Sequence, residues 1–207
     1  MHQPPAWILQ DAHRLTLEEF QQAFGEAWSR LKRRFLKVEC WQSYREADGV
    51  RSQKAYQEGK AELARELLRE EAKGDQPLYE EVNARNLEFT RIRLISLPLT
   101  DYLRYEMINY EIRRALGENI EFVTPPTPVT DYFDFLLFDD HTALIHDYGP
   151  GPVGHQVGGW VTRAAEPLKH LEKLACELRT YARPWPNVGE KGLPGRKTVD
   201  IAAQSRR

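Results

Sequence analysis

The second half of the chain alternates short apolar runs with a long capped segment, and this alternation most constrains the fold. The stretch EFTRIRLIS (88–96) predicts one strand, and NIEFVT (119–124) predicts another. Between them, Thr100 is an N-cap residue, Asp101 suits the first helical turn and Gly117 suits the end of a helix. A strand, a capped helix and a strand in succession favour a sheet covered by helices.

The chain continues with two further apolar runs, FDFLLF (133–138) and TALIHDY (142–148), which predict paired strands joined by a tight turn. A loop with five glycines and two prolines is expected from 149 to 159. The last helix is expected at about 164–182. This order of elements predicts an α/β (α+β-like) fold, in which helices flank a mixed β-sheet.

The first half predicts helices that cover the same sheet. A capping box formed by Thr16 and Glu19 opens a helix at 16–34, whose buried face carries Phe20, Phe24 and Trp28. A strand is expected at 35–42 and a second helix at 50–73.

The chain can therefore be divided into three parts. These are N-terminal helices with a strand (1–87), an α/β core (88–185) and a tail of low apolar content (186–207). The first two parts are expected to form one globular domain over 10–185.

Composition excludes several classes of protein. The net charge of -2 gives no overall basic excess for nucleic acid, and no run of 18 apolar residues could span a membrane. The N-terminus lacks the pattern of a signal peptide, and Cys40 and Cys176 are few and distant, which indicates reduced thiols. A cytoplasmic protein without a cofactor is expected.

The turn between the two apolar runs suggests the first candidate chemistry. Asp139, His141 and His146 could serve a metal- or histidine-dependent phosphodiesterase or nuclease. The alternative is that Asp139 shapes the turn by accepting backbone hydrogen bonds. The histidines lack the regular spacing of a metal site, and the glycine-rich loop lacks the Lys-Ser/Thr of a phosphate loop, so we favour the alternative.

The element order after residue 88 resembles one half of a phospholipase D-like unit. That superfamily carries a His-x-Lys pair followed four residues later by Asp, with the His attacking phosphorus. In register with Asp139, this chain has Tyr132 and Asp134 in place of the His and the Lys. An aspartate where a cation must bind phosphate reverses the electrostatics, so the resemblance implies the fold without the activity.

Three stretches over 35–185 resemble a second family, an actinobacterial domain of unknown function, number 6879. They are VECWQSY, RIRLISLPLTDYLRYEMINY and DFLLFDDHTALIHDYGPG. Members of that family often occur near Xre-type helix-turn-helix regulators, so the resemblance implies a regulatory or conflict-system setting and brings no established chemistry.

Two surfaces could bind a partner. Asp101, Arg104 and Tyr105 share one face of the predicted helix, with Tyr102 beside them, and this face could bind a protein. The second is a basic cluster flanked by aromatic residues, which could bind nucleic acid through phosphates and stacking. It consists of Arg30, Lys32, Arg33, Arg34 and Lys37.

The sequence therefore predicts a non-catalytic regulatory or interaction protein with a protein partner, which could be an Xre-type regulator or a second copy of the chain. The phosphodiesterase and a nucleic-acid-binding accessory subunit are the alternatives. Because acidic residues are interspersed throughout, nucleic-acid binding is expected to be weak.

Overall fold

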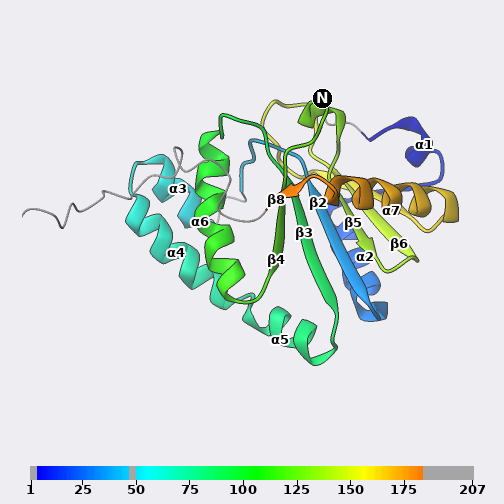
Figure 1. Ribbon diagram of the computed structural model, residues 1–207, viewed down its shortest axis with the longest axis horizontal. Helices are drawn as coiled ribbons and strands as arrows, with labels where there is room; N and C mark the ends of the chain where they lie inside the picture. The colour runs from blue at the N-terminus through cyan, green and yellow to red at the C-terminus, as the bar shows by residue number, and fades with distance from the viewer. Residues whose placement is uncertain (1–3, 47–49, 184–207) are drawn as a thin grey trace, which may run out of the picture.

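The computed structural model describes residues 4–46 and 50–183, and its centre is an eight-stranded mixed sheet (Figure 1). Strands β2, β3 and β4 run parallel, and every other neighbouring pair is antiparallel. In sheet order the strands are β1 (His13–Thr16), β7 (Gly158–Thr162), β6 (Thr142–Asp147), β5 (Phe135–Phe138), β2 (Arg34–Glu39), β3 (Glu88–Leu94), β4 (Asn119–Val123) and β8 (Ala182–Arg183). The predicted mixed sheet flanked by helices is confirmed.

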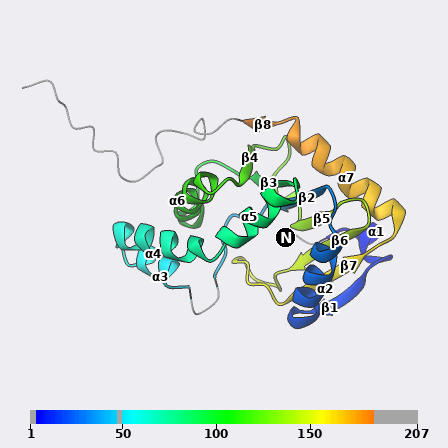
Figure 2. The same cartoon turned by 90° about the horizontal axis from the view of Figure 1, so that it is seen from below.

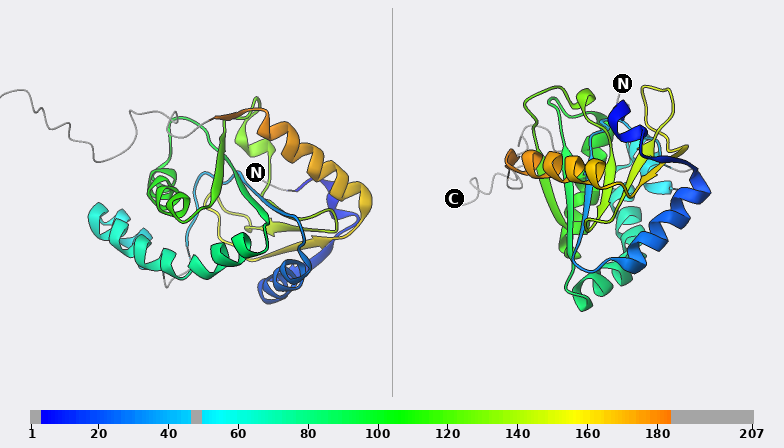
Figure 3. Two further views of the ribbon diagram at one scale, coloured as in Figure 1. Left: turned by 60° about the horizontal axis from the view of Figure 1, so that its bottom comes forward. Right: turned by 90° about the vertical axis from the view of Figure 1, so that its right-hand side faces the viewer.

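Helices lie on both faces of the sheet (Figures 2 and 3). Helix α7 covers one face, while α2 and α6 pack against different parts of the other face. The helices are α1 (Ala6–Leu9), α2 (Leu17–Arg30), α3 (Arg51–Gln57), α4 (Ala61–Lys73), α5 (Gln76–Ala84), α6 (Asp101–Ala115) and α7 (Ala165–Arg179), with a 3-10 turn η1 at Val129–Asp131. No helix in the described ranges is long and apolar enough to cross a membrane.

The predicted caps are present at both long helices. Glu19 N donates to Thr16 Oγ1 at 3.3 Å, and Thr16 N donates to Glu19 Oε2 at 2.8 Å, which completes the capping box of α2. Thr100 Oγ1 accepts a bond of 3.1 Å from Leu103 N at the start of α6, and Gly117 follows that helix with a φ of 106°.

Helix α2 packs its aromatic stripe on its own sheet, as predicted. Phe24 lies edge-on to Phe35 and Phe138, with ring centroids 6.0 and 5.3 Å away, and Trp28 is 5.6 Å from Phe35. Because β1 and β2 belong to the same sheet as the later strands, the segments before and after residue 88 share one core.

Two predicted elements differ from the structure in their bounds or continuity. The loop expected at 149–159 already contains the start of β7, which pairs with β6 and β1. Its glycines permit this close approach, since a Cβ on Gly159 would lie 2.3 Å from the carbonyl oxygen of Ile145. The helix expected at 50–73 is divided into α3 and α4 at Gly59, whose φ is 77°.

Candidate functional site

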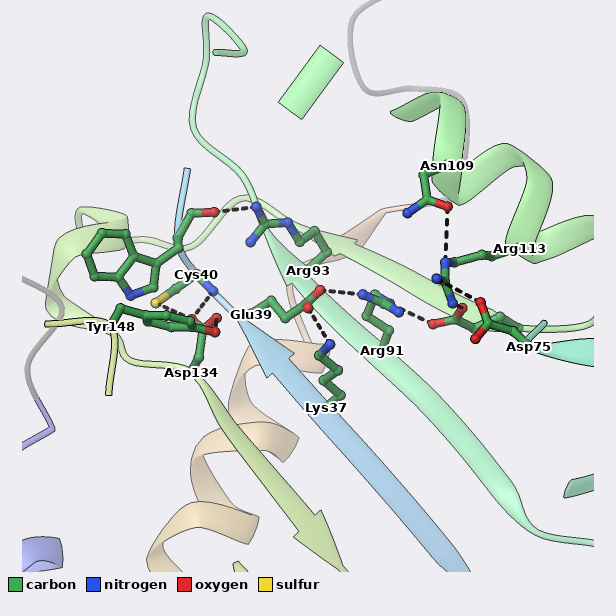
Figure 4. Close-up of polar contacts among 12 residues, drawn as sticks. Lys37, Glu39, Cys40, Asp75, Arg91, Arg93, Asn109, Arg113, Asp134 and Tyr148 are labelled. Carbon is green, nitrogen blue, oxygen red and sulfur yellow. Dashed lines mark hydrogen bonds and ion pairs between the residues drawn. The ribbon is translucent and has the colours of Figure 1, made fainter. Parts of the chain in front are cut away.

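A polar cavity of about 280 Å³ lies where β2, β3 and β6 end, beneath α6. We call it the strand-end pocket, and Figure 4 shows several of its side chains. It is lined by Lys37, Glu39, Trp41, Tyr44, Glu46, Arg91, Arg93, Tyr102, Glu106, Asn109, Arg113, Asp134, His146, Tyr148 and Gln156. The carboxyl ends of parallel strands are the usual position of ligand sites in α/β sheets.

The two-residue period of the central strands aims four charged side chains at this pocket. Lys37 of β2 is paired in register with Arg91 of β3, and Glu39 is paired with Arg93. Side chains two residues apart on a strand lie on the same face of the sheet. The four groups therefore share one face and point toward α6.

Helix α6 closes this face with a polar stripe. Tyr102, Glu106, Asn109 and Arg113 follow one another at intervals of four, three and four residues, which places them on one side of the helix. All four line the strand-end pocket. The neighbouring Tyr105 instead packs with α4.

One part of the pocket is electrostatically paired. Arg91 donates to Glu39 at 2.8 Å and to Glu118 at 2.6 Å, and Lys37 lies 2.7 Å from Glu39. Burial would raise the pKa of Glu39, but the charges of Arg91 and Lys37 outweigh it and hold that pKa well below its usual range. At Glu118, burial would likewise raise the pKa, but the charge of Arg91 and its hydrogen bond help to outweigh burial, and the pKa is lowered.

Arg113 extends the paired part toward α5. Its guanidinium lies 2.9 Å from Asp75 and 3.9 Å from Glu118, and its Nε donates to Asn109 at 3.1 Å. The hydroxyl of Tyr79 donates to Glu118 at 2.5 Å. These bonds tie α5, α6 and β3 together beside the pocket.

Asp134 is also engaged. Its Oδ1 accepts from Cys40 N at 2.7 Å and from Cys40 Sγ at 2.9 Å, and its Oδ2 accepts from the hydroxyl of Tyr148 at 2.8 Å. Burial and then the charge of Asp134 raise the pKa of Cys40 and of Tyr148 well above their usual values. Both groups are therefore neutral hydrogen-bond donors at pH 7, and the thiol is not an activated nucleophile.

Arg93 differs from its neighbour Arg91. It is 2% exposed, and a guanidinium Nη2 donates to the carbonyl oxygen of Trp41. Its Nε is shielded from solvent without a hydrogen-bond partner, and no carboxylate of the described residues lies within ion-pair distance. An arginine side chain stays charged when buried. Arg93 is therefore a buried cation without a direct counter-ion in the described chain.

Two acidic residues of the pocket also form no ion pair with a described residue, Glu46 and Glu106. Burial, followed by the charge of Glu106, raises the pKa of Glu46 to about 7. Burial, followed by the charge of Glu39, raises the pKa of Glu106. Glu46 therefore carries less than its full negative charge at neutral pH.

His146 lies against the aromatic side of the pocket. Its ring stacks on Tyr148 at 5.4 Å and contacts Phe20 at 4.9 Å. Neither ring nitrogen makes a hydrogen bond of good geometry to a described residue, although the Gln156 side chain lies beside the ring. Burial lowers the pKa of His146 to about 4, so the imidazole is neutral at pH 7.

The rim of the pocket is held by Gly154. Its N donates to Ser43 O at 2.9 Å, and its carbonyl oxygen accepts from Arg45 N at 2.9 Å. A Cβ at this position would lie 2.9 Å from the ring of Tyr44 and 3.1 Å from that of Trp41. A glycine is therefore needed for the loop after β6 to contact the segment after β2.

The turn residue Asp139 lies away from this pocket and has a structural role. Its carboxylate accepts from the backbone N of Lys32, Arg33 and Arg34 at 2.8, 3.0 and 2.8 Å. Burial would raise the pKa of Asp139, but these hydrogen bonds outweigh burial and lower that pKa. Asp139 thus fixes the end of α2 against the turn between β5 and β6. Its role is structural, but its carboxylate binds the backbone of residues 32–34 rather than the local turn that the sequence predicted.

The three candidate catalytic residues are not brought together. His141 lies 3.8 Å from Asp139 at the start of β6, whereas His146 is at the other end of that strand. No group of three His, Cys, Asp or Glu residues suited to a metal ion occurs in the described ranges. Asp139, His141 and His146 therefore do not share a site.

The predicted partner face on α6 is wrong in one respect. Asp101 and Arg104 do form a surface ion pair at 2.5 Å. Tyr105, however, is 2% exposed and bonds to Ser52 at 2.8 Å, because α3 and α4 cover this side of α6. Tyr102 is half-buried and lines the strand-end pocket. With Asp101 and Tyr105 it also lines a second hollow of about 590 Å³ between α3 and α6.

The basic cluster is divided rather than continuous. Arg33 pairs with Asp140 at 3.2 Å and Arg34 with Glu172 at 2.5 Å. Lys37 points into the strand-end pocket, whereas Arg30 and Lys32 are exposed. Nearby carboxylates thus offset much of the charge that the sequence grouped together.

Sequence reasoning missed most of the strand-end pocket. The available signal was alternation, because Arg91 and Arg93 are separated by one apolar residue, as are Lys37 and Glu39. Such alternation is typical of a strand with one solvated face. Here a helix covers that face, which became evident only from the tertiary structure.

Comparison with known proteins places the chain in a family. Comparison with curated proteins gives no match. Among solved structures, TrmBL2, an archaeal chromatin protein, is 9% identical with a TM-score of 0.40, and the match covers 83% of this chain and 53% of TrmBL2. Polyphosphate kinase from Porphyromonas gingivalis is 11% identical with a TM-score of 0.44, covering 88% of this chain and 29% of the kinase.

Both similarities are too low to support a functional argument, and the chain spans about half of the first protein and under a third of the second. The family result is clear. The profile of the domain of unknown function DUF6879 matches residues 22–187, and the chain belongs to that family.

Proposed function

We propose that this DUF6879 protein is a non-catalytic regulatory protein that binds a small polar ligand in the strand-end pocket. The observation that carries the proposal is the pocket itself, a cavity of about 280 Å³ lined by eight charged side chains, four of them on β2 and β3. Buried charges stabilise a fold less than apolar side chains of similar volume. Their concentration at the strand ends is therefore best explained by ligand binding.

We propose a non-catalytic protein because the potential reactive groups are engaged in structural hydrogen bonds. The carboxylate of Asp139 binds three backbone N–H groups, and that of Asp134 binds Cys40 and Tyr148. Tyr132, which replaces the nucleophile of a phospholipase D-like half, accepts a hydrogen bond from Thr127 at 3.1 Å. We therefore interpret the chain as a phospholipase D-like half that has lost its chemistry.

We propose a regulatory role because the sequence resemblance implies a regulatory or conflict-system setting, in which family members often occur near Xre-type helix-turn-helix regulators. A ligand in the strand-end pocket would contact the rim formed by Tyr44 and Gln156. These residues belong to the segments that Gly154 holds together. We propose that ligand binding orders this rim and so changes the surface that a protein partner contacts.

A thermal-shift screen of charged and neutral small molecules tests the proposal. We expect some to raise the melting temperature of the wild-type protein, and the substitution Asn109→Phe, which places a ring in the pocket, to abolish that shift. Ala115→Phe, at an exposed position of α6 outside the pocket lining, is the matched control and should preserve it. Stabilisation that persists in Asn109→Phe would place the ligand elsewhere, and the absence of any stabilising compound would refute ligand binding.

A further inference from the structure

We propose that the ligand of the strand-end pocket carries an oxyanion, a carboxylate or a phosphate, that binds the guanidinium of Arg93. This inference rests on the proposed function and specifies the chemical class of the ligand. It depends on the unpaired state of Arg93, on the engagement of the nearby carboxylates and on the charge balance of the lining.

Arg93 meets the requirements of an anion-binding residue. It is almost fully buried, lines the pocket and has a shielded Nε with no partner. A guanidinium offers five donors in a planar fork that fits carboxylate and phosphate oxygens. Its bond to the carbonyl oxygen of Trp41 fixes the side chain and leaves donors available.

The nearest acidic groups do not fill this role. Both oxygens of Glu39 are engaged, one by Lys37 at 2.7 Å and the other by Arg91 at 2.8 Å. Both oxygens of Asp134 accept bonds from Cys40 or Tyr148. Figure 4 shows Arg93 above Glu39, with Asp134 farther to the left, and dashed lines connect both carboxylates to other groups. Their charges stabilise the Arg93 cation without forming an ion pair with it.

Arg91 provides an internal control for this reading. It lies two residues away on the same strand and on the same face, and it has two carboxylate partners. The chain therefore pairs one buried arginine completely and leaves the next unpaired. An uncompensated buried cation is costly, so a bound anion is the simplest partner for it.

The remaining charges of the pocket favour an anion as well. The lining holds four cations and four acidic residues. Protonation of Glu46 and Glu106 would leave two carboxylates facing four cations. The charged groups that act on Glu106 are Glu39 of β2, Arg91 and Arg93 of β3, and Arg113 of α6. Those that act on Glu46 are Glu106, Lys37, Glu39 and Arg113. A bound oxyanion is expected to favour the protonated forms of both glutamates, and binding should therefore tighten as pH falls.

The rest of the lining suits a small organic molecule. Aromatic rings of Trp41, Tyr44, Tyr102 and Tyr148 lie around the charged groups. Such rings can contact the body of a ligand while Arg93 holds its acidic group. A volume of about 280 Å³ limits the ligand to the size of a small metabolite.

Isothermal titration calorimetry at pH 6 and pH 8 tests the inference with four probes. Inorganic phosphate, adenosine monophosphate and glutarate carry the oxyanion, and choline is a cation of similar size. We expect at least one oxyanion probe to bind the wild-type protein. Glutarate, which stays ionised over this range, should bind more tightly at pH 6, whereas the phosphates take up a proton themselves between pH 8 and pH 6. Binding of the phosphates alone assigns a phosphate group, and binding of glutarate alone assigns a carboxylate.

Three variants identify the contact. Arg93→Met should weaken oxyanion binding at least about tenfold, since a charge-assisted hydrogen bond is lost. Arg93→Lys, which keeps the charge without the planar fork, should retain part of the affinity. Arg33→Met, at an exposed arginine, should bind like the wild type. Circular dichroism of each variant establishes that it is folded.

The possible failures are distinguishable. Unchanged oxyanion binding in folded Arg93→Met would overturn the role of Arg93. If the thermal-shift screen yields cationic or neutral ligands that depend on the pocket and no oxyanion binds, the proposed function stands and this inference fails. If no compound binds at all, the proposed function fails first.

Discussion

The two faces of the central sheet are made by the same strands but differ in chemistry. The side chains on the face under α7 are apolar and form a closed core. They are Leu36, Val38, Ile92, Leu94, Phe135, Leu137, Ala143 and Ile145. The intervening residues point to the opposite face, and those at the strand ends are polar and surround a cavity. They are Lys37, Glu39, Arg91, Arg93, Asp134 and His146.

The charged face is itself divided. Toward the amino ends of β2 and β3, Phe35 and Phe89 stack under α2 in an aromatic cluster. The polar part lies toward the carboxyl ends of β2 and β3, beneath α6, and next to it α6 packs on the apolar Ile120 and Phe122 of β4. Stability is therefore expected to depend on the α7 face, on the cluster under α2 and on the ion pairs of Arg91, whereas the proposed binding function is confined to the corner around Arg93. Substitutions in the α7 face, in the aromatic cluster under α2 and in the charged corner should separate stability from ligand binding.

The largest effect is expected at the paired arginine. Arg91→Met leaves Glu39 and Glu118 buried without their main cation, and the free energy of unfolding should fall by roughly 3–5 kcal/mol. Urea unfolding followed by circular dichroism measures this. A loss below about 1 kcal/mol would show that the paired part of the pocket is not a structural unit.

A comparable loss of stability without loss of binding is expected on the other face. Leu137→Ala opens a cavity in the α7 core and should cost roughly 2–5 kcal/mol. In the calorimetric assay, the folded variant should bind the oxyanion probes like the wild type. Weaker binding would mean that the two faces are coupled.

Asp139→Ala tests the aromatic half. Three backbone N–H groups lose their acceptor, so stability should fall by roughly 1–3 kcal/mol, while ligand affinity stays unchanged. Urea unfolding and calorimetry measure the two quantities. A phosphodiesterase activity of the wild-type protein that disappears in this folded variant would contradict the structural role of Asp139.

A smaller effect, of opposite sign, is expected from Glu46→Gln. The pKa of Glu46 is raised in the folded state to about 7, so the folded protein binds this proton more tightly than the unfolded chain does. The resulting stability is present at low pH and is lost as pH rises through 7. Above pH 7 the variant should be more stable than the wild type by on the order of 1 kcal/mol, and below pH 5 the difference should vanish. Unfolding curves that show no pH-dependent difference would place Glu46 in solvent.

Local signals in the sequence were sufficient for much of the fold. The capping box at Thr16 and the N-cap at Thr100 correctly located the starts of α2 and α6, because a cap depends on a few adjacent residues. β7 was missed because Gly158 and Gly159 resemble a loop. Their role is to let β1 and β6 approach from both sides, which is a tertiary property.

The site was less predictable for the same reason. Alternating charges such as Arg91 and Arg93 indicate a strand with one polar face, and sequence alone cannot say whether water or a helix covers that face. Tyr105 was assigned to a partner surface because its helical face was recognised without the α3 and α4 helices that bury it. In both cases the missing information was the packing of distant segments.

The central claim is that Arg93, the arginine of the charged corner without an ion pair to a described residue, is maintained for a ligand rather than for stability, and Arg93→Met tests it most directly. The measurement is the free energy of unfolding in a buffer free of phosphate and carboxylates, beside that of the wild type and Arg91→Met. Because Arg93 has no counter-ion in the described chain, we predict no loss of stability, or a small gain, together with the loss of oxyanion binding. A loss as large as that of Arg91→Met would show that Arg93 is a structural residue and would contradict the account.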